Sequence, residues 1–117
     1  MLRRMTSFLA SVTGRYPSAF GYMLRAMDFY LSEPKEIAVV GDLDSHEVRS
    51  FVREIYEHYI PNKVVAGSEP MNEAAASEIK LLTGKVAVET ATAYVCRNYV
   101  CLAPATSAEQ LASRLSE

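Results

Sequence analysis

A strand–helix–strand pattern in the middle of the chain constrains the fold more than any other feature. Residues 36–41 (Glu-Ile-Ala-Val-Val-Gly) form a short run rich in β-branched residues that a glycine closes, which is typical of a buried strand. Residues 63–67 (Lys-Val-Val-Ala-Gly) predict a second strand, and apolar residues at three- and four-residue spacing predict a helix between the two. A unit of this length predicts two parallel strands with a right-handed crossover.

The ends of the predicted helix carry their own signals. Asp44, followed three residues later by Glu47, has the form of a capping box at the helix start. Pro61 and Asn62 are expected to close the helix. The apolar positions of its inner face are Val48, Phe51, Val52, Ile55, Tyr56 and Tyr59.

The C-terminal half continues with shorter elements. An alanine-rich helix is expected over 73–82, ended by Gly84, and a brief strand over 85–88. Residues 92–96 (Thr-Ala-Tyr-Val-Cys) predict a firmer strand. A second capping box, from Ser107 to Gln110, predicts a last helix. Its inward residues are expected to be Leu111, Ala112 and Leu115.

Helical spacing of apolar residues predicts a helical hairpin at the N-terminus, with Pro17 in the first turn of its second helix. A methionine-rich face of this hairpin is a candidate interaction face. Its members are Met5, Phe8, Phe20, Met23 and Met27. Two alternatives stay open: the hairpin covers the chain's own sheet, or it meets a partner.

These elements predict an α/β fold, with an N-terminal helical hairpin and then a small three- or four-stranded, partly parallel sheet with flanking helices. At 117 residues and 50% hydrophobic content, the chain is expected to form a single domain over 1–117, with the hairpin at 1–32 and the α/β unit at 36–117.

Composition excludes several classes of partner. A net charge of −2 provides no basic surface for nucleic acid, and no apolar run approaches the ~20 residues that cross a bilayer. The stretch from Met1 to Met27 contains arginines and serines but no acid, as organelle transit peptides do. An ordinary hairpin with a basic polar face is the favoured interpretation, and the cytoplasm is the expected compartment.

Cys96 and Cys101 are the first candidates for chemistry. If Asn98 and Tyr99 form a two-residue hairpin turn, the two cysteines lie opposite each other, within reach of a disulfide. If the strand runs straight, they point to opposite faces. Buried thiols acting as small apolar residues are the favoured interpretation, and a thiol pair is the alternative.

Other candidate sites are weaker. Asp42 and Asp44 follow an apolar strand, as the catalytic aspartates of haloacid-dehalogenase-like phosphatases do, but the chain is too short for that fold. His46 and His58 match no standard zinc spacing and fit a solvated helix face. No catalytic residue, cofactor-binding residue or metal ligand is therefore assigned, and no cofactor is expected.

Residues 91–104 (Ala-Thr-Ala-Tyr-Val-Cys-Arg-Asn-Tyr-Val-Cys-Leu-Ala-Pro), with the capped helix behind them, carry a family resemblance. They resemble the extreme C-terminus of the thioredoxin-domain proteins related to the spermatogenesis-associated thioredoxin-like protein. Residues 37–41 and the Tyr-Ile-Pro-Asn-Lys-Val-Val run at 59–65 are similar to that family in order and spacing. The resemblance extends over essentially the whole chain.

The resemblance implies a longer architecture, in which a thioredoxin-like domain precedes a toroid of paired helices like that of six-hairpin glycosidases and sugar epimerases. The resemblance implies that this chain corresponds only to the last helical hairpin and the small α/β tail. The family's Cys-x-x-Cys has no counterpart here, because four residues separate Cys96 from Cys101. No active-site residue of the family is carried over, so the chain is not expected to be an enzyme on its own.

The expected function is that of a non-catalytic accessory or interaction module, whose partner is a second copy or a helical-toroid protein. Two alternatives remain. The chain forms part of a sugar-processing enzyme that another polypeptide completes, or it is a small thiol switch.

Overall fold

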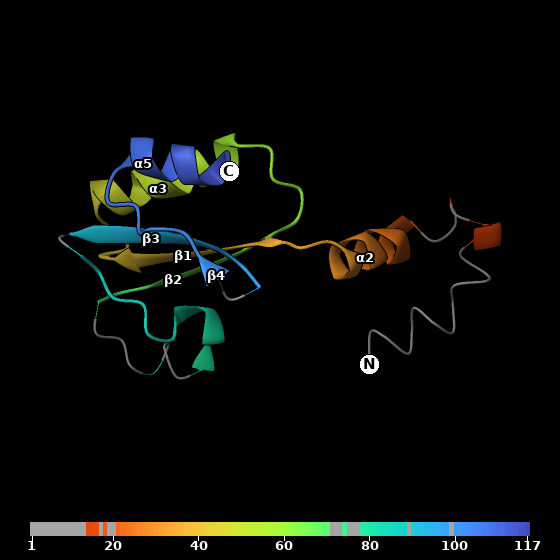
Figure 1. Ribbon diagram of the computed structural model, residues 1–117, viewed down its shortest axis with the longest axis horizontal. Helices are drawn as coiled ribbons and strands as arrows, with labels where there is room; N and C mark the ends of the chain where they lie inside the picture. The colour runs from red at the N-terminus through yellow and green to blue at the C-terminus, as the bar shows by residue number, and fades with distance from the viewer. Residues whose placement is uncertain are drawn as a thin grey trace. The chain divides into compact units, whose positions relative to one another are not determined.

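Four strands form one mixed sheet in the order β2-β1-β3-β4 (Figure 1). The central strand β1 (Lys35–Gly41) runs parallel to β2 (Lys63–Ser68) and antiparallel to β3 (Ala91–Arg97), and β3 pairs with the short β4 (Val100–Cys101). The computed structural model describes residues 14–16, 18, 21–70, 74, 78–88, 90–98 and 100–117. The predicted α/β fold with a partly parallel sheet is confirmed.

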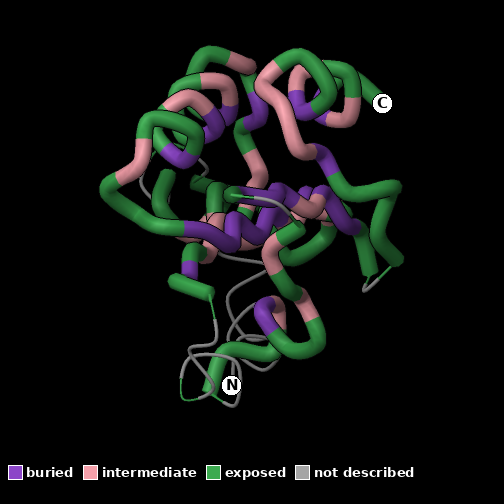
Figure 2. Tube along the Cα trace, turned by 90° about the vertical axis from the view of Figure 1, so that its left-hand side faces the viewer, coloured by how far each residue is buried: buried purple, intermediate pink, exposed green. Residues whose placement is uncertain are grey.

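Two helices cover one face of the sheet. They are α3 (His46–Glu57) and α5 (Ala108–Leu115), which pack against each other over β1 and β3 (Figure 1). The strands and the inner sides of the helices carry the buried residues (Figure 2). The core between these layers consists of Ile37, Val39, Val48, Phe51, Ile55, Ile60, Ala91, Ala93, Val95, Ala105, Leu111 and Leu115.

The structure corrects the predicted ends of α3. The N-cap is Ser45 rather than Asp44, because the Ser45 side chain accepts the hydrogen bond from the Val48 backbone N–H. The helix ends at Glu57, well before Pro61, so Tyr59 lies outside it and is 93% exposed. Three of the predicted inner positions are buried, namely Val48, Phe51 and Ile55, whereas Val52 and Tyr56 are exposed.

The opposite face of the sheet carries the segment before β3. A single 3₁₀ turn, η2 (Lys80–Leu82), buries Leu82 against β1 and β2. The expected helix does not run unbroken to Leu82, because Ile79 has extended backbone angles. Residues 73 and 75–77 of that expected helix lie outside the described residues.

The prediction of a strand over 85–88 is wrong. The backbone N–H and C=O of Val88 both bond to the Thr92 hydroxyl, at 2.7 and 2.9 Å. The Tyr94 hydroxyl donates to the Val86 carbonyl at 2.6 Å. Side chains of β3 therefore form hydrogen bonds with backbone groups that would otherwise pair with a neighbouring strand. Residues 85–88 form irregular structure.

The last helix begins as predicted. The Ser107 side chain accepts from the Gln110 backbone N–H at 3.2 Å, so Ser107 is the N-cap of α5. Gln110 completes the cap by accepting from the Thr106 backbone N–H at 2.9 Å. Leu111 and Leu115 are buried, as the pattern predicted.

The chain divides into two compact units, Met1–Glu33 and Pro34–Glu117. The described helix of the first unit is α2 (Gly21–Leu31), which contains no buried residue. The first helix of the predicted hairpin lies outside the described residues, as do Met5, Phe8 and Phe20 of the candidate interaction face. None of the helices in the described ranges is long and apolar enough to cross a membrane.

Candidate functional site

The β3–β4 hairpin brings the two cysteines together. Cys96 and Cys101 are directly opposite each other in the register and form a disulfide, with their Cα atoms 3.9 Å apart. The Leu102 N–H donates to the Val95 carbonyl at 2.9 Å, so the neighbouring pair is the hydrogen-bonded one. The cysteines occupy a non-hydrogen-bonded position, where side chains on opposing strands approach most closely. Of the two geometries left open by the sequence, the chain adopts the hairpin, so the favoured interpretation of two buried free thiols is wrong.

The turn of this hairpin depends on Asn98. Its φ of 48° lies in the left-handed region, which asparagine adopts more readily than most residues. A positive φ at the first central residue is typical of a two-residue hairpin turn between twisted strands. The usual Asn-Gly signal is absent from the sequence, which explains why the turn could not be chosen from sequence alone.

The disulfide is asymmetric in its exposure. Cys96 is 2% exposed, whereas Cys101 is an exposed residue on the edge strand β4. Because successive strand residues point to opposite faces, the pair lies on the face away from the core, in which Val95 takes part. Cys101 is therefore the residue of the disulfide that is more accessible from solution.

Asp42 and Asp44 have a structural role at the start of α3. Both are exposed, and the Asp42 carboxylate accepts from the Asp44 backbone N–H at 3.0 Å. The Ser45 hydroxyl donates to the Asp42 carbonyl at 2.6 Å. The aspartates thus shape a turn before the helix. Across the described ranges, no group of three or more His, Cys, Asp or Glu residues could hold a metal ion.

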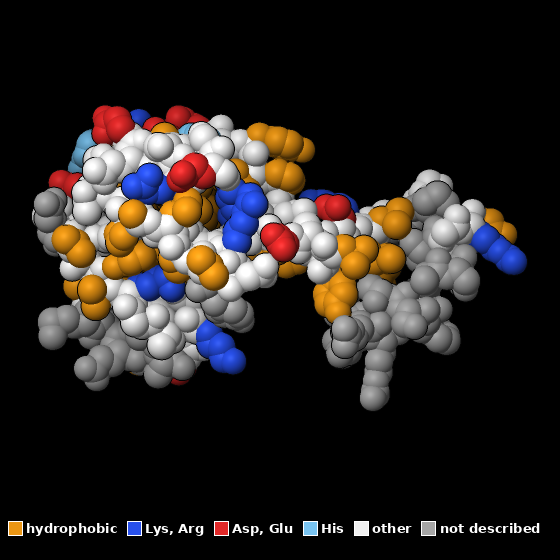
Figure 3. Space-filling view, in the orientation of Figure 1, with side chains coloured by type: hydrophobic (Ala, Val, Ile, Leu, Met, Phe, Trp, Pro, Cys, Tyr) orange, Lys and Arg blue, Asp and Glu red, His pale blue; other side chains and the backbone are white. Residues whose placement is uncertain are grey.

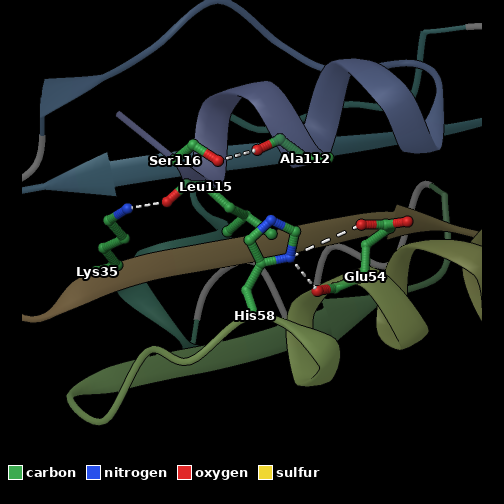
Figure 4. A network of polar contacts seen from close by, with 6 residues as sticks. All are labelled: Lys35, Glu54, His58, Ala112, Leu115 and Ser116. Atoms are coloured by element: carbon green, nitrogen blue, oxygen red, sulfur yellow. Dashed lines mark hydrogen bonds and ion pairs between the residues drawn. The ribbon is translucent and has the colours of Figure 1, made fainter.

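The two histidines lie at opposite ends of α3 and form no shared site. His46 is the exposed first residue of the helix. His58 caps the other end: its Nδ1 lies 2.8 Å from the Glu54 carbonyl oxygen and 3.7 Å from the Glu54 carboxylate (Figure 4). These contacts account for His58 as a helix-capping residue.

Lys35 has unusual surroundings that the sequence did not predict. Lys35 is only 9% exposed, and its ammonium donates to the Leu115 carbonyl at the end of α5 (Figure 4). A lysine just before an apolar run resembles the ordinary polar boundary of a strand. Only the tertiary structure reveals that this lysine is largely buried and that its ammonium lies beside the C-terminus of a helix.

The fold and the hairpin define a small mixed α/β module with a cross-strand disulfide. Spermatogenesis-associated protein 20 of Homo sapiens is 33% identical to the chain over 94 residues, which are 79% of this chain. The match spans 12% of the length of the human protein, so the chain is related to that protein as a partial segment. No protein-family model matches the chain, and no solved structure matches it.

Proposed function

We propose that this chain is a non-catalytic interaction module, corresponding to the C-terminal segment of a thioredoxin-domain protein, and that it binds a helical partner through α2. The observation that carries the proposal is the composition of α2. Among its eleven residues, only Arg25 and Asp28 are charged, and none is buried. A helix that is apolar around most of its circumference is normally covered by other protein.

The exposed apolar side chains of α2 form the surface that a partner would cover. Several large apolar residues of the helix are exposed, including Tyr22 at 88% and Leu31 at 76%. An isolated helix of this length is marginal in water, so most of its stability must come from packing. Met23 and Met27 are half-buried, and methionine suits a surface that adapts to its partner.

The match to the human protein supports the same proposal. That protein extends far beyond the matched segment, which is 12% of its length. A helical surface outside the segment is the partner we propose, in the manner of a toroid of paired helices. In the absence of that partner, a second copy of this chain offers the apolar face of its own α2.

The mass of the purified chain in solution tests the proposal. We expect light scattering to give a mass above that of one chain, rising with concentration, because the α2 faces cover each other. Met27→Glu places a charge in the apolar face and should return the mass to that of a single chain.

Arg25→Glu is the matched control, because it adds the same side chain on the side of α2 that carries the charged residues. Its mass should follow that of the wild-type chain. A wild-type chain that stays monomeric at every concentration would show that α2 is covered within the chain, and the proposal would fail.

The cross-strand disulfide favours a second candidate function, a thiol switch. In such a switch, one thiolate of a dithiol attacks the Cys101 sulfur and Cys96 leaves as a thiolate. The second thiol then breaks the mixed disulfide. The dithiol loses two electrons and two protons, and the chain gains two free thiols.

Reduction should therefore destabilise the hairpin measurably. Opening a loop of this size is expected to lower the free energy of unfolding by about 2 kcal/mol, because the unfolded chain regains conformational entropy. Thermal melts with and without dithiothreitol would measure the change. A Cys96→Ala/Cys101→Ala chain should melt at the same temperature in both conditions.

Thiol counting on the denatured chain gives an independent check. We expect no free thiol before reduction and two after it, since the described cysteines are both bonded. Two free thiols in the untreated chain would contradict the switch. The sugar-processing alternative requires a second polypeptide, and it would gain support only from co-purification of the chain with a helical-toroid partner.

A further inference from the structure

A half-open groove lies on the helix-covered side of the sheet, where β1 begins, β3 ends and α5 ends. Its volume is about 280 Å³. Val95, Val100 and Leu102 provide its apolar wall. This size and lining fit a small ligand with an apolar portion.

The charges around the groove are unbalanced. Lys35, Arg97 and Arg114 line it, and Glu117 is the one acidic residue among its lining residues, so the formal charge of the lining side chains is three positive minus one negative, or +2. The whole chain carries −2. Positive charge is thus concentrated here against the overall balance. Figure 3 shows basic, acidic and hydrophobic side chains close together on the surface below α5.

Two of the three cations keep donors for a ligand. The Lys35 ammonium has three N–H donors, and within the described part of the chain it makes one hydrogen bond, to Leu115 (Figure 4). The Arg97 side chain makes no hydrogen bond or ion pair with any described residue. Some of the Arg114 donors are already used: its Nε donates to the Ala103 carbonyl at 3.1 Å, and its Nη1 lies 3.8 Å from the Glu117 carboxylate.

The environment of Lys35 is unfavourable for its positive charge. Burial lowers the pKa of Lys35, the nearby Arg97 lowers it further, and Glu117 partly opposes both effects. A negative charge close to Lys35 and Arg97 would relieve this cost by favouring the charged form of the lysine.

We propose that the groove binds a small organic carboxylate. Its carboxylate group pairs with Lys35 and Arg97, and its aliphatic or aromatic portion lies against Val95, Val100 and Leu102. The apolar wall selects this class over inorganic anions, which bring no surface to bury. The site belongs to the unit formed by residues 34–117 and uses no residue of α2. Its test is therefore independent of the proposed binding of a helical partner through α2.

Titration of the full ¹⁵N-labelled chain with hexanoate tests the proposal. We expect saturable shifts of the backbone amides around β3, β4 and the end of α5, with a dissociation constant on the order of 1 mM. Acetate and inorganic phosphate should bind at least several-fold more weakly, since they lack the apolar portion. Hexanamide, which keeps the chain length but not the charge, should cause no saturable shift.

Variants identify the residues involved. Arg97→Gln should weaken hexanoate binding about tenfold or more, because it removes a charge-assisted contact at an exposed position. Val100→Ser should weaken it several-fold by removing part of the apolar wall. Arg53→Gln neutralises an exposed cation on α3 outside the groove and should leave binding unchanged.

Three results with hexanoate would overturn the proposal. They are equal binding of hexanoate and hexanamide, wild-type affinity in the folded Arg97→Gln chain, and shifts that stay linear to tens of millimolar hexanoate. Stronger binding of phosphate than of hexanoate would also contradict it, because the groove would then be a simple anion site.

Discussion

Phe51→Ala is expected to lower the free energy of unfolding by about 3–5 kcal/mol. Among the described residues, Phe51 is the largest fully buried side chain, 1% exposed, and it extends from α3 into the core. Truncation removes the transfer free energy of the ring and leaves a cavity that strands on one side and helices on the other cannot close. Because small domains are stable by only ~5–15 kcal/mol, this one change should remove a large share of the stability.

Urea unfolding followed by circular dichroism would measure the loss. Val52→Ala is the matched control, because it lies on the same helix but is 41% exposed, and it should cost less than ~1 kcal/mol. Equal losses for the two variants would contradict the packing described for α3.

Gly41→Ala is expected to cost about 1–3 kcal/mol, although it adds only one methyl group. Gly41 ends β1 and lies opposite Ala91 in the register. A Cβ at this position would lie 2.9 Å from the Ala91 Cβ and 3.1 Å from the Thr90 carbonyl oxygen. Because backbone atoms of β3 form part of the obstacle, the strands must separate locally to admit the methyl group.

A second glycine provides the control for Gly41. A Cβ at Gly67 would meet its nearest neighbour, the Leu43 Cδ2, at 3.6 Å, which is ordinary contact. Gly67→Ala should therefore be neutral or slightly stabilising, since alanine restricts the unfolded chain more than glycine does. Chemical denaturation of both variants would separate a steric effect from a general effect of replacing glycine.

The pairing with Ala91 can be tested in the same way. In an Ala91→Gly background, Gly41→Ala should cost clearly less than in the wild-type chain, because the closest contact is gone. Equal costs in the two backgrounds would show that the strand ends relax without regard to this contact.

The strongly patterned elements of the fold were predictable, whereas the details between them were not. The strands that begin at Lys35 and Lys63 and the helix through Phe51 followed from short apolar runs and helical spacing, which depend on local chemistry. The predicted N-cap of α3 was Asp44, whereas the observed N-cap is Ser45, because the Asp42 side chain accepts a hydrogen bond from the Asp44 N–H in a turn before the helix. Several polar residues in a row offered equally good local signals there, and three-dimensional geometry chose among them.

The candidate sites were less predictable, because each depends on residues distant in the sequence. The strand predicted over 85–88 does not form, because the Thr92 hydroxyl makes hydrogen bonds with both the N–H and the C=O of Val88. The charge cluster around Lys35 joins the start of β1 to Arg97 at the end of β3 and to the C-terminal turn of α5. No spacing rule relates residues so far apart, and only strand register and helix packing bring them together.

The sequence by itself determined the α/β class, the parallel pair β1–β2, the start of the last helix and the apolar character of α2, because periodicity and capping chemistry act over a few residues. The tertiary structure alone decided that Cys96 meets Cys101, that Lys35 is buried and that a positive groove forms above the end of the sheet. These features arise from strand pairing and from the packing of α5, whose free energies are summed over contacts that a local pattern does not contain.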